Sequence, residues 1–107
     1  MSSHTVRFRE RAASDVDDAV DRYQRDAGEA VALDFIESLE RCVRQIGGAP
    51  HIGSLRFSYE LGIPELRVLG TRQFPYLVFY VPDDDSIEIW RVLHSRRDIP
   101  ATLAEDP

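Results

Sequence analysis

The sequence of 107 residues contains no lysine, and all thirteen of its basic residues are arginines. The absence of lysine excludes a lysine general base and a lysine Schiff base, and it favours planar, forked contacts from arginine to carboxylate or phosphate groups. The acidic residues outnumber the basic ones and give a formal net charge of −6 at pH 7. Because non-specific binding to nucleic acid depends on basic groups that release counterions, we expect no direct DNA binding by this chain alone.

Long apolar runs, paired cysteines and clustered histidines are also missing. No apolar run approaches the roughly 18 residues that span a bilayer, and residues 1–14 lack the apolar block of a secretory signal, so we expect a cytoplasmic chain. Cys42 stands alone at an apolar position of a helical pattern, which predicts a small core residue. His4, His51 and His94 are scattered, and no glycine-rich phosphate loop or serine nucleophile motif occurs. The sequence therefore predicts no metal site and no cofactor.

Composition and length are those of one globular domain, which we place at residues 1–107. Apolar residues recur at three- and four-residue steps over residues 10–25 and again over residues 29–46, which predicts two amphipathic helices. Gly28 separates them by so short a link that they must form an antiparallel hairpin. The charged residues of the first helix are interpreted as a solvated outer face: Asp15, Asp17, Asp18, Asp21 and Arg22.

The second half of the chain has the residue pattern of β-strands. Residues 55–59 alternate between apolar and polar side chains and are short enough to be an extended loop. Strands are predicted at residues 65–69, 76–81 and 87–93, and a short one at residues 5–8. The turn sequence "PDDDS" makes the last two strands an antiparallel hairpin.

The order of these elements predicts an α+β fold. An N-terminal strand and an antiparallel helical hairpin pack on one face of an antiparallel sheet of three to four strands. A short C-terminal tail or helical turn follows Pro100. The opposite sheet face either stays open for a partner or is covered by this tail.

The last predicted strand brings polar side chains into an otherwise apolar segment. Regular alternation places Ile87, Ile89, Arg91 and Leu93 on one face and Glu88, Trp90, Val92 and His94 on the other. An arginine on an apolar face is usually paired, so we expect a carboxylate partner for Arg91. His94 ends the strand beside arginines that favour its neutral form, which makes it a candidate base. The alternative is a ring that caps the sheet edge or bonds the backbone.

Residues 65–103, "ELRVLGTRQFPYLVFYVPDDDSIEIWRVLHSRRDIPATL", resemble the strands and terminal motif of the RelE/ParE superfamily of bacterial toxins, and specifically its ParE-like branch. Residues 12–53 are similar to the helical hairpin of that family and to its Pro-x-x-Gly loop. The resemblance implies a toxin that inhibits DNA gyrase and is neutralised by a ParD-like antitoxin, which wraps the hairpin and the sheet. It leaves two alternatives: a RelE-like, ribosome-dependent mRNA endoribonuclease, and an inactive relative that only binds its antitoxin.

Cleavage of RNA requires a base, an acid and cations for the developing phosphorane charge. The central strand "YLVFYV" has no basic residue, no tyrosine follows Tyr80, and lysine is absent. This incomplete set favours a non-enzymatic inhibitor of gyrase. If the chain is a ribonuclease, its candidate catalytic residues are His94, Arg91 and Arg96.

Two sets of side chains are candidate binding residues. The first surrounds "RVLHSRRD" and is interpreted either as a docking patch for an acidic protein surface or as a structural cluster in which Arg96 or Arg97 pairs with Asp98 or with an acid of the hairpin. These target-binding candidates are Arg67, Arg72, Arg91, His94, Arg96 and Arg97. The second set consists of apolar and aromatic side chains that the antitoxin is expected to contact: Val20, Tyr23, Phe35, Leu39, Tyr80 and Trp90.

Overall fold

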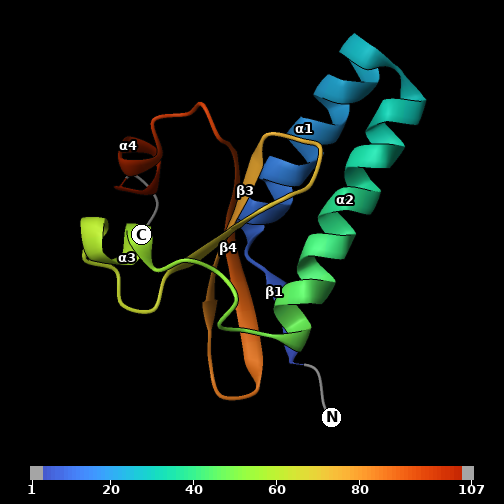
Figure 1. The fold of residues 1–107 in the computed structure, drawn as a ribbon. Coiled ribbons are helices and arrows are strands. Elements are labelled where there is room, and N and C mark those ends of the chain that lie inside the picture. The colour runs from blue at the N-terminus through green and yellow to red at the C-terminus, as the bar shows by residue number, and fades with distance from the viewer. Residues whose placement is uncertain (1–3, 105–107) are drawn as a thin grey trace.

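The computed structural model describes residues 4–104 as an antiparallel helical hairpin packed on one face of a four-stranded sheet (Figure 1). The elements follow the order β1 (Thr5–Phe8), α1 (Glu10–Ala27), α2 (Glu29–Gly48), α3 (Arg56–Leu61), β2 (Arg67–Gly70), β3 (Tyr76–Pro82), β4 (Ser86–His94) and α4 (Ile99–Ala104). This arrangement confirms the predicted α+β fold. Among residues 4–104, no helix combines the length and the apolar content of a membrane span.

Gly28 makes the tight connection between α1 and α2. Its φ of 96° lies in a region that L side chains rarely adopt, so glycine is needed there. The Gly28 N–H donates to the carbonyl of Gln24, and the Gly28 carbonyl accepts from the N–H of Ala32 at 3.2 Å. The last turn of one helix is thereby joined directly to the first turn of the next, and the two helices run side by side (Figure 1).

The sheet has the strand order β1-β4-β3-β2. The pairs β2–β3 and β3–β4 are antiparallel, as predicted. The pair β1–β4 is parallel, with Thr5 opposite Ser86 and Phe8 opposite Ile89, so the sheet is mixed. A parallel pair requires a long connection between its strands, and the helical hairpin forms part of the connection here. Side-chain patterns within one strand do not report its direction, so the parallel pairing of β1 with β4 could not be predicted from them.

A β-bulge in β4 changes which side chains face the helices. The register of β3 and β4 shifts so that Trp90 has no residue directly opposite. Ile89 before the bulge and Val92 after it both pack in the core beneath the hairpin, whereas Leu93 packs on the opposite face. The expected regular alternation along β4 is therefore wrong beyond Trp90, because a bulge inserts one extra residue into the alternation.

The opposite face of the sheet is covered by α3 and α4, which lie next to each other (Figure 1). This second core contains Phe57, Leu66, Val68, Phe79, Leu93, Ile99 and Leu103. The C-terminal segment therefore folds over the face that the sequence left unassigned. The expectation of an extended segment at residues 55–59 is wrong: Phe57 and Leu61 lie one helical turn apart in α3 and both pack against this core.

Gly53 lies in close contact with the central strand. Its N–H donates to the Tyr80 hydroxyl at 2.9 Å, and that hydroxyl donates to the carbonyl of Pro50 at 2.8 Å. Burial raises the pKa of Tyr80, so the hydroxyl keeps its proton over the neutral range. A Cβ atom added at position 53 would lie 2.7 Å from the Tyr80 hydroxyl and 2.9 Å from the carbonyl of Val68.

We therefore expect Gly53→Ala to lower the free energy of unfolding by about 1–3 kcal/mol, the usual cost of overpacking. Urea denaturation followed by circular dichroism measures this change. Gly48→Ala is the matched control, because no atom lies within 4 Å of a Cβ added at that position. Since alanine is the better helix former, the control should be neutral or stabilising. Equal midpoints for the two variants would contradict the close contact at Gly53.

Candidate functional site

Arg91 is held in a buried ion pair rather than presented to a target. Its Nε donates to Asp15 Oδ2 at 2.8 Å and its Nη2 donates to Asp15 Oδ1 at 2.9 Å. The N–H of Val92 donates to Asp15 Oδ2 at 3.0 Å. The Arg91 side chain is 4% exposed and that of Asp15 is 11% exposed. The expected carboxylate partner of Arg91 is thus confirmed, and the placement of Asp15 on a solvated face is wrong, because this α1 carboxylate is directed at β4.

His94 lies at the edge of a small polar cleft between α1 and the end of β4. Its ring packs edge-on against Tyr76 with the centroids 5.3 Å apart. Its Nδ1 accepts the backbone N–H of Arg96 at 3.1 Å, which leaves the proton of the neutral ring on Nε2. The cleft has a volume of about 180 Å³ and is lined by Asp15, Asp18, Ala19, Arg22, Tyr76, Val92, His94 and Arg97.

This cleft brings together only part of the predicted basic set. His94 and Arg97 line it, while Arg96 is exposed and contributes only its backbone N–H to His94. Arg22 was missed as a member, although its position in α1, seven residues after Asp15, places both on one helix face. The carboxylates of Asp15 and Asp18 share the cleft, so it is not purely cationic.

Asp98 caps α4 and does not pair with the neighbouring arginines. Its Oδ1 accepts the N–H of Ala101 at 3.2 Å, and its carbonyl accepts the Thr102 hydroxyl at 2.8 Å. Within residues 4–104, neither Arg96 nor Arg97 forms an ion pair. The proposed pairing of Arg96 or Arg97 with Asp98 or with an acid of the hairpin is therefore absent from the described residues.

The remaining target-binding candidates lie apart from this cleft. Arg67 donates through Nη1 to the carbonyls of His51 at 3.0 Å and Gly53 at 2.9 Å, so it fixes the loop that precedes α3. Arg72 is exposed in the loop between β2 and β3, where it lines a different pocket beside α2. The structure therefore divides the predicted patch among several places.

The side chains expected to contact an antitoxin are mostly interior. Phe35 and Tyr80 have no exposed surface and Leu39 is 5% exposed, so the side chains of these three residues form the core beneath the hairpin. Val20 and Tyr23 are half-buried at the edge of that core. The other member, Trp90, packs on the opposite sheet face, and the guanidinium of Arg9 stacks 3.9 Å from its ring centroid.

An apolar groove that the sequence did not single out lies where β1 meets the two long helices. It has a volume of about 440 Å³ and is lined by Phe8, Val16, Ile36, Leu39, Glu40, Val43 and Arg44. Phe8 is one of the exposed large hydrophobic residues, with 39% of its surface accessible. The residues that line this groove come from the edges of the apolar stripes of the sequence, where the pattern of apolar and polar residues does not separate core from surface. We refer to these residues as the apolar groove.

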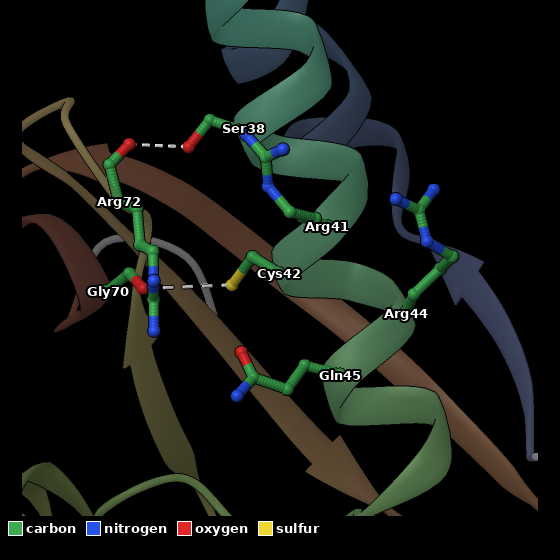
Figure 2. Close-up of a pocket in the computed structure, with 7 residues that line it drawn as sticks. All are labelled: Ser38, Arg41, Cys42, Arg44, Gln45, Gly70 and Arg72. Carbon is green, nitrogen blue, oxygen red and sulfur yellow. Dashed lines mark hydrogen bonds between the residues drawn. The ribbon is translucent and has the colours of Figure 1, made fainter.

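A second cavity lies on the other side of α2, between this helix and the loop after β2. It has a volume of about 430 Å³ and is lined by Ser38, Arg41, Cys42, Arg44, Gln45, Gly70 and Arg72, which we name the arginine pocket. The Ser38 hydroxyl donates to the carbonyl of Arg72 at 2.5 Å (Figure 2). Figure 2 shows Arg44 extending from the opposite side of α2 toward β1, so Arg44 borders both cavities.

Cys42 is the buried cysteine that the sequence predicts, with 4% of its surface exposed. Burial raises the pKa of the Cys42 thiol to about 11 from an ordinary value of 9.0. Because only the thiolate reacts, the native chain should react with iodoacetamide at pH 8 about 100-fold more slowly than the chain unfolded in urea. Mass spectrometry measures both rates, and the native rate should rise about tenfold per pH unit until about pH 11. Equal rates in the two states would contradict this assignment.

Residues 4–104 contain no group of three or more side chains suited to hold a metal ion. The polar side chains found above are suited to ion pairing and hydrogen bonding with a partner.

Comparison with known proteins gives this arrangement a family. The family model for the ParE toxin of the type II toxin–antitoxin system, parDE, matches residues 6–99. The solved structure of a chromosomal ParDE TA system from P. aeruginosa has a similar fold, with a TM-score of 0.71 and 22% sequence identity over 86% of this chain and 96% of that chain. No curated protein matches the chain. The resemblance inferred from the sequence is confirmed, and the chain belongs to the ParE toxin family of type II toxin–antitoxin systems.

Proposed function

We propose that this ParE-family chain acts as a protein-directed inhibitor of DNA gyrase and is neutralised by a ParD-like antitoxin. The observation that carries the proposal is the dispersal of the residues that a ribonuclease would need. Arg91 is buried against Asp15, and the side chain of Arg96 does not line the His94 cleft. Arg22 and Arg97 do line the cleft beside His94, but two carboxylates line it as well, so the cleft lacks the excess positive charge that phosphoryl transfer requires.

The electrostatics of the His94 cleft support the same conclusion. The carboxylate of Asp18 lines it beside Arg22 and Arg97 and would repel a phosphate group, while that of Asp15 is paired with Arg91. The chain as a whole carries a formal charge of −6, which is unfavourable for docking on ribosomal RNA. An acidic protein surface matches the exposed side chains of Arg96 and Arg97 better than ribosomal RNA does. Two arginines can form local ion pairs with such a surface even when the chain as a whole is acidic. Action on gyrase implies a cytoplasmic location.

The apolar groove is the proposed docking site for the antitoxin. Exposed apolar surface rimmed by charged groups is typical of protein interaction sites. Here the groove has Glu40 and Arg44 among its lining residues and offers Phe8, Ile36 and Val43 as apolar contacts. An antitoxin segment with apolar residues at helical spacing would fill it in the manner of a helix bound in a groove.

Induction of this chain alone in a bacterial host tests the proposal. Incorporation of labelled thymidine and labelled methionine is followed in one culture during the first minutes. We expect thymidine incorporation to fall first while methionine incorporation continues, and we expect the purified chain to block supercoiling by gyrase in vitro. Collapse of methionine incorporation first would overturn the proposal in favour of a ribonuclease. His94→Gln should then abolish the effect. If neither rate falls while soluble protein accumulates, the chain is an inactive, antitoxin-binding relative.

A further inference from the structure

The arginine pocket is a basic site in an acidic chain. Arg41, Arg44 and Arg72 are among its lining residues, and no aspartate or glutamate is, although the guanidinium group of Arg44 extends on the other side of α2 toward β1 (Figure 2). Among residues 4–104, Arg44 and Arg72 form no ion pair, and Arg41 approaches a carboxylate only at the 4.0 Å limit of its contact with Glu37. The charges of this pocket are therefore available to an anion from outside the chain.

The loop that carries Arg72 is fixed before any ligand binds. The Ser38 hydroxyl ties the carbonyl of Arg72 to α2, and the Thr71 hydroxyl donates to the carbonyl of Phe74 at 2.9 Å. The thiol of Cys42 lies 3.9 Å from the carbonyl of Gly70 and adds a weak contact (Figure 2). A loop held in this way loses little further backbone entropy on binding, which favours affinity.

The pocket also lies next to the apolar groove, with only α2 between them. Arg44 lines both cavities, so a polypeptide that crosses α2 meets an apolar surface on one side and guanidinium groups on the other. A free phosphate ion would make no favourable contact with the apolar groove. A protein segment that carries both apolar and acidic side chains matches both halves.

We propose that the arginine pocket binds carboxylates of an acidic segment of a partner protein, whose apolar side chains occupy the adjoining groove. The identity of that partner as the antitoxin rests on the proposed function. The net charge of −6 does not oppose this binding at short range, because distant surface charges are screened beyond about 8 Å at physiological ionic strength. Forked guanidinium contacts to carboxylates act at hydrogen-bond distance and persist.

The test uses the full chain labelled with ¹⁵N and the acetylated, amidated peptide Glu-Glu-Glu-Glu, with the Gln-Gln-Gln-Gln peptide as the uncharged control. The side-chain Nε–H signals of Arg41 and Arg72 should shift with the acidic peptide and not with the control. The signal of Arg25, at the far end of α1 beside Asp26, should not move. We expect Arg72→Gln to weaken binding about fivefold, and Arg41→Gln with Arg72→Gln about tenfold or more, as for exposed ion pairs. Arg25→Gln should leave binding unchanged.

Two results would overturn the proposal. One is the absence of shifts at Arg41 and Arg72, or equal shifts at Arg25, with the acidic peptide. The other is tighter binding of inorganic pyrophosphate than of the acidic peptide at these signals, which would identify a phosphate site instead. These results are separate from the induction experiment: peptide binding without growth arrest would refute the proposed function alone, and growth arrest without peptide binding would refute the pocket alone.

Discussion

Replacing Asp15 with alanine is expected to lower the free energy of unfolding by about 3–5 kcal/mol, because it removes the bidentate carboxylate partner of the buried Arg91 guanidinium. The loss includes the bidentate contacts of Arg91 and the acceptor of the Val92 N–H. Since a domain of this kind has only about 5–15 kcal/mol of stability in total, a measurable fraction of the variant should be unfolded at 37 °C. Urea denaturation at 25 °C gives the difference directly.

Two comparisons make this prediction specific to the buried pair. Glu88→Gln removes the Arg9–Glu88 pair, which has a 3.1 Å contact but side chains that are 33% and 38% exposed, and should cost no more than about 1 kcal/mol. The double replacement Asp15→Leu with Arg91→Met should recover most of the stability that Asp15→Ala loses, because a well-packed apolar pair avoids the desolvation of two charges. If Asp15→Ala and Glu88→Gln cost the same, the Asp15–Arg91 pair is not a major stabilising contact.

The helices and the carboxylate partner of Arg91 were predictable because each depends on a local rule. The period-3.6 patterns and the single Gly28 define the hairpin. A buried arginine requires a counter-charge, whichever element of the fold supplies it. The bulge at Trp90 was not predictable, because it depends on the register of β4 with β3 rather than on β4 itself. The short helix α3 was also missed, because five residues of apolar alternation are too few to separate a helical turn from an extended segment.

The candidate site was harder to predict than the fold. "RVLHSRRD" is a continuous basic stretch in the sequence, yet the structure buries Arg91 and leaves Arg96 exposed, with only His94 and Arg97 in one cleft. The arginine pocket combines α2 side chains with Arg72, from a loop about 30 residues later. Such a site depends on the packing of α2 against the sheet, which no motif in either segment reports.

Replacing Ile36 with aspartate is expected to weaken binding of the proposed ParD-like antitoxin by a factor of about 30 or more, the effect of losing a central interface contact of about 2 kcal/mol. Ile36 lines the apolar groove together with Val16 and Val43, and a carboxylate there would have to be desolvated when apolar side chains dock. The loss should appear chiefly as faster dissociation, measured by surface plasmon resonance with the co-encoded antitoxin immobilised.

Leu33→Asp provides the matched control for this experiment. Leu33 is also an apolar residue of α2 and is 55% exposed, but it does not line the groove. Aspartate there changes the net charge equally and lowers helix propensity at least as much, and it should leave antitoxin binding within about twofold of the unaltered chain. If both variants lose binding alike, the effect is one of charge on the hairpin as a whole. If neither variant loses binding, the antitoxin docks elsewhere on the toxin, and the proposed role of the apolar groove is wrong.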